Sequence, residues 1–363
     1  MIIVVGAGIA GLSLAYELCQ RGSQVTVLEA DTIASGASGV ATSYLEPRLG
    51  TTPARAIEHE AMRRWEDYTA DLEAVSGFSV GFRREGQIRV TLAENLVKFE
   101  KDLDARAAQN EVFEHLSAEA ARKLEPALSN AIVAAAYLPH VRWVTGSKVC
   151  ESLATAIRSQ GGKIEERVAV TAIERQGSQL RLTTDTGSFL DAERIVLCTG
   201  MGVQDISGLP EDIPQSRPVR GVNLILDQSA LKSPLKHLVK HHRGNLCPRE
   251  DNQLIVGTTY EAGETSLEPG PDVIEFLYRN AEPILPVVRD LLLIRVTSGL
   301  RSKVGDGNLR LGRSTEEPNI FYSLSHAGAG YLRAPVVADE FAGFVLGGEP
   351  GALTRHITDG RAD

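Results

Sequence analysis

Cysteine, aromatic residues and positive charge are all scarce in this chain of 363 residues. It has four cysteines, 5% aromatic residues and a formal net charge of -9. None of the cysteines has disulfide-framework or zinc-ligand spacing, which predicts reduced, buried thiols. Proteins that bind the phosphates of nucleic acid need a basic surface. Because this chain is acidic overall, a nucleic-acid partner is not expected. The simpler expectation is a small-molecule partner.

Long hydrophobic runs and an export signal are absent as well. No apolar stretch approaches the ~20 residues that a membrane span requires. A strand begins at residue 2 without a charged segment or cleavage site before it, so we expect a cytoplasmic protein with no membrane association. The length exceeds what one hydrophobic core usually supports, which predicts two domains or one domain with a large insertion.

A glycine-rich turn follows the apolar, β-branched run at residues 2–5. Gly6 permits a tight turn, Gly8 lets the backbone approach a pyrophosphate, and Gly11 lets the next helix pack on the strand. That helix is predicted over residues 9–21, with free amides at its start. The cofactor-binding residues predicted from this turn are Gly6, Gly8, Ile9, Ala10 and Gly11.

An acidic residue ends the second predicted strand, residues 24–28. Glu29 lies about twenty positions after the turn, where its carboxylate accepts hydrogen bonds from ribose hydroxyls, and Ala30 follows it. Strand, glycine turn, helix, strand and acid therefore occur in the order of a dinucleotide-binding unit. This unit alone does not distinguish FAD from NAD.

A loop of small residues, Ala-Ser-Gly-Ala-Ser-Gly at 34–39, comes next and precedes residues 40–49. Here the sequence resembles the D-amino-acid oxidase family of flavoproteins, which includes glycine oxidase. In that family the ribose-binding acid is followed by such a loop and then by a flavin-facing stretch. The resemblance implies FAD as cofactor, with contacts from Ser35, Gly36, Ala37 and Ser38.

The resemblance continues to the C-terminal part of the chain. A predicted strand at 163–170 matches the family's strand beside the adenine, and the strand at 194–198 matches its second pass under FAD. The loop at 326–330 and a predicted helix at 335–345 match the family's flavin loop. No cysteine lies in that loop, so the resemblance implies non-covalent FAD. The further contacts that it implies are Val168, Cys198, Thr199, Gly200, Arg301, Gly328, Gly330, Tyr331 and Leu332.

The expected fold class is α/β, with a discontinuous Rossmann-type FAD-binding domain and an α+β substrate domain that contains an antiparallel sheet. We assign residues 1–80, 140–205 and 295–363 to the FAD-binding domain. Residues 81–139 and 206–294 form the substrate domain. Strands are predicted at 221–226, 245–248 and 253–259 in the latter, followed by a helix at 271–281.

Arg301 matches the arginine that binds the substrate carboxylate in the family. A guanidinium suits this role because it forms two parallel hydrogen bonds with a carboxylate. Two family features are missing, since Asn245 replaces a tyrosine and Gly328 replaces an arginine. Tyr260 could supply the lost hydroxyl or pack structurally, and Glu46 or Arg48 could touch the substrate. These considerations leave the substrate open.

Histidines offer weaker candidates. His326 could act as an acid or base, but the resemblance makes it chiefly a flavin-loop residue. His241 and His242 are adjacent, and neighbours on a strand face opposite sides, so a solvated turn is expected there rather than a metal site.

The expected activity is oxidation of the carbon next to the nitrogen of a small amino acid or secondary amine. It would yield an imine and, with oxygen as electron acceptor, hydrogen peroxide. The sequence leaves two questions open, namely whether another electron acceptor replaces oxygen and whether the protein is a homo-oligomer. Residues 36–39 and 257–260 also resemble the oxidase domain of the bacterial tRNA wobble-uridine modification enzyme. This resemblance implies, as an alternative substrate, a carboxymethylaminomethyl group on the wobble uridine of tRNA. The remaining alternatives are a non-catalytic flavin-binding subunit and an NAD-dependent dehydrogenase.

Overall fold

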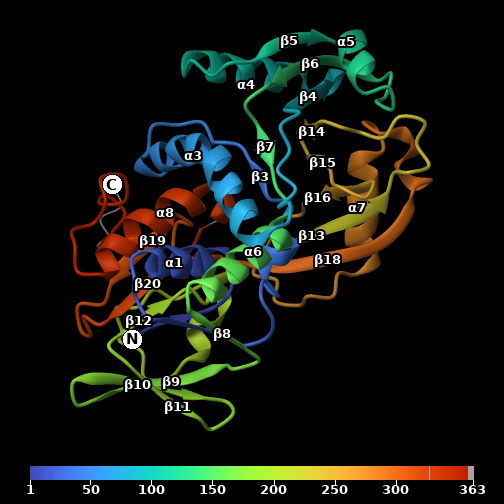
Figure 1. The fold of residues 1–363 in the computed structure, drawn as a ribbon. Coiled ribbons are helices and arrows are strands. Elements are labelled where there is room, and N and C mark those ends of the chain that lie inside the picture. Colours follow the sequence, from blue (N-terminus) through green and yellow to red (C-terminus); the bar gives the residue numbers. More distant parts are fainter. Residues whose placement is uncertain (327, 359–363) are drawn as a thin grey trace.

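A computed structural model describes residues 1–326 and 328–358 (Figure 1). Its first sheet has six strands, with a parallel centre because β1 pairs with both β2 and β12 in parallel. Only the edge strand β19 is antiparallel to its neighbour. In spatial order the strands are β19 (Arg310–Arg313), β20 (Ile320–Leu324), β12 (Arg194–Leu197), β1 (Ile2–Val5), β2 (Val25–Glu29) and β8 (Lys163–Glu166).

Both faces of this sheet are covered, as the uninterrupted apolar run at 2–5 requires. Ile2 and Val4 belong to a core shared with helices, whereas Ile3 and Val5 belong to a core shared with a small antiparallel sheet. The helices are α1 (Ile9–Gln20), α3 (Pro53–Ser76), α6 (Gly146–Ser159) and α8 (Gly330–Val345). The small sheet comprises β9 (Val170–Gln176), β10 (Gln179–Thr184) and β11 (Phe189–Ala192).

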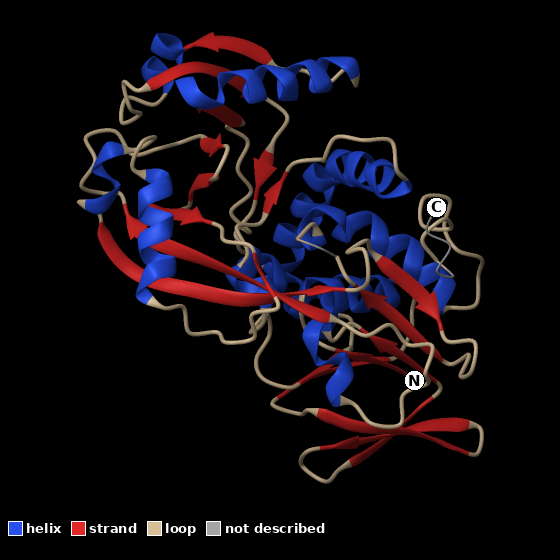
Figure 2. Ribbon diagram, turned by 180° about the vertical axis from the view of Figure 1, so that it is seen from behind, coloured by secondary structure: helices blue, strands red, loops and turns tan. Residues whose placement is uncertain are grey.

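A mixed, mainly antiparallel sheet of nine strands forms the other half of the molecule. Its two longest strands run side by side over their whole length, as Figure 2 shows from behind. They are β13 (Arg217–Asp227) and β18 (Leu292–Lys303). The other strands are β4 (Gln87–Leu92), β5 (Glu114–Ser117), β6 (Ile132–Leu138), β14 (Leu238–His241), β15 (Gly244–Pro248), β16 (Gln253–Gly257) and β17 (Glu261–Ala262).

The two faces of the nine-stranded sheet differ in character. One face packs against α7 (Pro271–Ala281) through an apolar cluster that includes Val222, Leu224 and Val256. The opposite face, called the polar face below, carries Asn223, Asn245 and Thr297 next to the apolar Ile225 and Ile255. The remaining elements are α2 (Ala37–Val40), β3 (Tyr44–Leu45), α4 (Leu96–Ala108), α5 (Ala118–Leu124) and β7 (Arg142–Trp143).

Three local predictions differ from the structure. The final helix α8 begins at Gly330, so Pro335 lies inside it and not in its first turn; almost the whole helix is buried, and packing overrides the cost of an interior proline. The strand predicted at 163–170 stops at Glu166, because Arg167 has a φ of 60° and breaks it. His241 ends strand β14 and is buried, where a solvated turn was expected.

The predicted fold class is confirmed, with its parallel and antiparallel sheets. The domain division stays a proposal. Strand β18 crosses the boundary at residue 295, and all twelve of its residues run along the nine-stranded sheet. Residues 327 and 359–363 of the proposed FAD-binding domain lie outside the described part of the chain.

Candidate active site

Three glycines shape the turn after β1 by allowing close backbone contact. Gly6 has a φ of +107°, and a Cβ there would lie 2.5 Å from the carbonyl oxygen of Cys198. A Cβ on Gly11 would lie 1.9 Å from the Gly6 carbonyl oxygen, and one on Gly8 would lie 3.0 Å from Oγ of Ser38. Side chains at these positions would therefore fill the turn and its approach to the 34–39 loop.

Glu29 and Ser38 are tied to this turn by hydrogen bonds. The Glu29 carboxylate accepts from the backbone N–H of Ala7 at 2.7 Å, which holds it at the mouth of the turn. Oγ of Ser38 accepts from the N–H of Ile9 at 3.0 Å, at the start of α1. Val168 lies beside Glu29, since its N–H donates to the Glu29 carbonyl oxygen at 2.9 Å.

The start of α8 reaches the same place from the C-terminal side. A Cβ on Gly330 would lie 3.3 Å from Cγ2 of Ile9, so the first turns of α8 and α1 are adjacent. The Tyr331 hydroxyl donates to the Ser38 carbonyl oxygen at 2.8 Å, and Leu332 is buried beside it. Residues that are distant in sequence, at 6–11, 29–38 and 330–332, thus surround one region.

Two buried polar atoms in this region have no protein partner. They are Oγ1 of Thr199 and Nδ1 of His326. A buried polar atom is normally hydrogen-bonded, so these atoms fit a polar group that comes from outside the chain. Together with the glycine turn and the Glu29 carboxylate, they fit the pyrophosphate, ribose and ring of a flavin dinucleotide.

The other residues predicted to contact the cofactor lie in the connecting backbone. Ala10 is in the first turn of α1, Ala30 directly follows β2, and Gly200 begins a short 3-10 helix with a φ of +58°. Ser35 and Gly36 precede α2, and Ala37 begins it. Their contacts with FAD stay predictions.

Arg301 extends from β18 across a glycine of the neighbouring strand. A Cβ on Gly221 would lie 2.2 Å from its Nη2 atom, so only glycine leaves room for the guanidinium. Nη2 donates to Oγ1 of Thr258 at 3.0 Å, and Nη1 donates to the carbonyl oxygen of Thr259 at 3.3 Å. Gly328 lies next to the same side chain, because a Cβ on Gly328 would be 3.9 Å from Cδ of Arg301.

No carboxylate neutralises this arginine. Among the residues that the structure describes, none has a carboxylate oxygen within the 4.0 Å of an ion pair with Arg301. Burial lowers the pKa of the guanidinium, and the nearby Tyr44, Tyr260 and Glu261 partly offset this effect. A half-buried cation without a counter-ion is suited to binding an anionic ligand.

A row of polar side chains lies on the same face of the sheet. Asn223 is in register with Thr297 of β18 and Gly257 of β16, and Gly257 is in register with Asn245. The two asparagines are 3% and 5% exposed, and Oδ1 of each has no partner in the described structure. Oδ1 of Asn223 occupies the space that a Cβ on Gly257 would fill, at 2.0 Å.

Asn223 was not predicted as a site residue. Its signal is present in the sequence, because it is the one polar residue in the apolar run from Val222 to Leu226. The partner strand that brings it beside Asn245 could not be read from that pattern.

The other predicted substrate residue, Arg48, lies in a different setting. Its guanidinium pairs with the carboxylate of Glu58 on α3, which is fully buried. The same carboxylate accepts from Arg55 at 2.9 Å and from the buried Arg333 of α8 at 2.7 Å. Arg48 is thus held by an ion pair, and its contact with substrate stays a prediction.

Tyr260 and His326 complete the candidates. Tyr260 directly follows Thr259, and its side chain is 65% exposed. Nε2 of His326 lies 3.1 Å from the Ser323 hydroxyl, and burial together with the charge of Arg333 lowers the pKa of His326 to about 3. His326 is therefore neutral near pH 7, which fits a neutral residue of the loop better than an acid.

All four cysteines are free and buried, as the sequence predicts. Burial raises the pKa of Cys198, next to the glycine turn, to about 12. A thiol with so high a pKa stays protonated near pH 7 and is a poor nucleophile.

The fold and the site therefore define a flavin-dinucleotide-dependent oxidoreductase. The family model for FAD dependent oxidoreductases (DAO) matches residues 1–343. The chain belongs to this family. No helix in the described part of the chain is long and apolar enough to cross a membrane.

Individual relatives and solved structures agree with this assignment. The chain is 26% identical to a glycine oxidase of Bacillus licheniformis over 95% of this chain and 92% of that protein. The crystal structure of glycine oxidase from Geobacillus kaustophilus matches with a TM-score of 0.91 and 23% identity, over 100% of this chain and 98% of the other. L-proline dehydrogenase from P. horikoshii matches with a TM-score of 0.84 and 19% identity, covering 98% and 95%.

Proposed function

We propose that this protein oxidises the carbon next to the nitrogen of a small amino acid or secondary amine. The observation that carries this proposal is the half-buried guanidinium of Arg301, which lacks a counter-ion and lies beside Gly328 of the C-terminal loop. Similarity to proteins named glycine oxidase supports it. Non-covalent FAD, a cytoplasmic location and the contacts predicted around Gly8, Glu29 and Tyr331 are parts of the same proposal.

FAD, when bound, accepts the hydride that leaves this carbon and passes the electrons to oxygen or another acceptor. The chain's own residues orient the substrate. Arg301 holds the carboxylate through two parallel hydrogen bonds, which fixes direction as well as position. Oδ1 of Asn223 and of Asn245 lie on the same face and accept hydrogen bonds from the amine N–H. Loss of the hydride leaves an iminium ion, which gives up its N–H proton to solvent, and the imine then leaves without a covalent bond to the protein.

The test is anaerobic bleaching of the flavin absorbance by a panel of substrates. Glycine, sarcosine, D-alanine, D-proline and larger secondary amines cover the proposed class. Bleaching by one of these, but not by the same amine without its carboxylate, is the expected result. A flavin that none of them reduces would contradict the proposal and favour a non-catalytic flavin-binding subunit. Oxygen uptake then distinguishes an oxidase from a dehydrogenase.

A further inference from the structure

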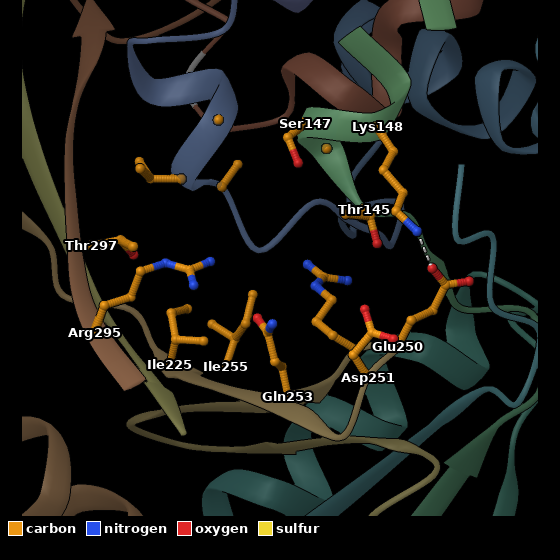
Figure 3. A pocket seen from close by; sticks show the side chains of 15 residues that line it. Thr145, Ser147, Lys148, Ile225, Glu250, Asp251, Gln253, Ile255, Arg295 and Thr297 are labelled. Atoms are coloured by element: carbon orange, nitrogen blue, oxygen red, sulfur yellow. Dashed lines mark hydrogen bonds and ion pairs between the residues drawn. The ribbon is translucent and has the colours of Figure 1, made fainter. Parts of the chain in front are cut away.

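A cavity of about 220 Å³ lies on the polar face of the nine-stranded sheet, away from Arg301. Its walls come from the segment Gly39 to Ala41, from the first turn of α6 and from strands β13, β16 and β18. Figure 3 shows Arg295 reaching into the cavity from one side, with Thr297 next to it and Thr145 and Ser147 opposite.

Two guanidinium groups in this cavity lack a carboxylate partner. Within the described residues, no carboxylate oxygen lies within ion-pair distance of Arg249 or Arg295. Arg249 donates one hydrogen bond to the Thr42 carbonyl oxygen, while its Nη1 atom is buried without a partner. Lys148 is already paired with Glu250. The cavity therefore has unused donors and an unneutralised positive charge.

Hydroxyl groups add further unused hydrogen-bonding capacity. Oγ1 of Thr297 is buried without a partner and belongs to the cavity wall. The 14-residue helix α6 begins at Gly146 without a side-chain cap, which leaves backbone N–H groups at its first turn. Asp251, which is exposed, also lines the cavity and opposes this positive charge. The cavity volume of about 220 Å³ limits the ligand to a small anion.

This cavity is separate from the site at Arg301. Along β18, Arg295 and Thr297 line the cavity, whereas Arg301 lies beyond Gly299. Gly299 is covered by α2, since a Cβ there would lie 2.5 Å from Cγ2 of Val40. The Val40 carbonyl oxygen is in turn fixed by Nδ2 of Asn223 at 2.9 Å. The segment 37–41 therefore stands between the two arginine sites.

We propose that this cavity is a second anion site that binds a small oxyanion, a carboxylate or a phosphate group, between Arg249 and Arg295. Guanidinium groups and hydroxyls are the donors that such groups prefer. The ligand contacts the wall formed by residues 39–41, and Arg249 connects it to the Thr42 carbonyl. Binding is therefore expected to stiffen the beginning of the predicted flavin-facing stretch, residues 40–49.

Isothermal titration of the FAD-saturated protein with inorganic phosphate, and separately with acetate, tests this proposal. The ionic strength is held constant with sodium chloride, because screening alone would otherwise change the signal. Because Arg301 is itself proposed to bind a carboxylate, one saturable site per chain that persists in Arg301→Ala is expected. The anion that binds this site more tightly shows whether the natural ligand carries a phosphate or a carboxylate. Arg295→Gln is expected to weaken binding by about tenfold or more, as for loss of a charged hydrogen bond.

Three further variants make the test specific. Arg217→Gln removes an exposed arginine from the end of β13 and is expected to bind like the wild type. Arg301→Ala is expected to retain the anion, which separates this site from the proposed substrate site. Thr297→Val should weaken binding without a change of charge. Absence of saturable binding, or wild-type affinity in Arg295→Gln, would overturn the proposal, and either result leaves the oxidation of amines untouched.

Discussion

Two regions of the molecule contain arginine side chains with opposite kinds of partner. Around Glu58, three arginines share one fully buried carboxylate. On the polar face of the nine-stranded sheet, Arg301 has only a hydroxyl and carbonyl oxygens as partners. The first arrangement is complete without a ligand, whereas the second leaves a charge for a ligand to neutralise.

From this difference we propose that the arginines around Glu58 are structural and that Arg301 binds a ligand. The Glu58 cluster joins the loop at Arg48, helix α3 and, through Arg333, helix α8. Its carboxylate keeps a pKa below the ordinary range despite burial, because the arginines oppose the cost of desolvation. The cluster therefore fixes α8, the helix whose first turn adjoins the glycine turn.

The largest effect is expected for Glu58→Gln. Removing the carboxylate charge leaves Arg333 buried without its counter-ion, and breaking a buried pair in this way costs about 3–5 kcal/mol. The free energy of unfolding from urea titration measures this loss. Glu66→Gln is the matched control, since Glu66 lies on the same helix in an exposed pair with Arg84. Equal losses in the two variants would contradict the assigned role of Glu58.

Arg301→Ala should affect activity rather than stability. With FAD retained and the visible spectrum nearly intact, kcat/KM for the best amino-acid substrate should fall by about 2–5 kcal/mol of transition-state stabilisation, or roughly 30-fold to several-thousand-fold. Arg301→Lys should recover only part, because an ammonium cannot reproduce the paired geometry. Steady-state kinetics provide the measurement. An unchanged kcat/KM would make Arg301 structural and remove the reason for a carboxylate in the substrate.

The two regions also differ in how far the sequence predicts them. The dinucleotide unit is predictable because its requirements are local: Gly6 has a positive φ, and Gly11 allows a carbonyl contact within five residues. The row of Asn223, Gly257 and Asn245 depends on the register of three strands that are distant in sequence. Local patterns contain no information about that register.

Burial also explains the local errors. Pro335 is expected near a helix start because proline lacks the N–H that an interior helical position uses. Helix α8 is packed on α1 and α3, however, and these tertiary contacts determine where it begins. His241 is the last residue of strand β14 and directly precedes a turn, so neighbouring residues alone could not decide whether it belongs to the strand or to the turn.

A third prediction concerns acid stability. Glu46 is buried and pairs with Arg89 at 2.8 Å, Arg106 at 3.0 Å and Lys240 at 2.5 Å. Despite desolvation, these cations lower the pKa of the Glu46 carboxylate. A carboxylate with a depressed folded pKa stabilises the protein above its unfolded pKa of about 4.3, and this contribution disappears as the pH falls toward the folded value.

Glu46→Gln should therefore lose about 2–3 kcal/mol of unfolding free energy at pH 7, the size expected for one strongly depressed carboxylate. Its stability should also depend less on pH between about 5 and 3 than that of the wild type. Urea titrations at several pH values measure both effects. Parallel pH profiles for the two proteins would show that Glu46 is not the group that titrates.

The smallest effect is expected for Arg48→Gln, and it tests the comparison most directly. The sequence offers Arg48 as a residue that could touch the substrate, and the structure pairs it with Glu58. Its side chain is 41% exposed, and Glu58 keeps two other arginines when Arg48 is lost. An ion pair of this exposure contributes about 0–1 kcal/mol, so the free energy of unfolding should change by no more than that.

Arg55→Gln removes another partner of the same carboxylate and is the control. If kcat/KM stays within about twofold in both variants, or within about 0.4 kcal/mol, Arg48 is structural. A tenfold loss of kcat/KM in Arg48→Gln alone, with FAD and stability retained, would show that an arginine already paired in the protein still contacts the substrate, and the lack of a counter-ion would then no longer distinguish the two kinds of arginine.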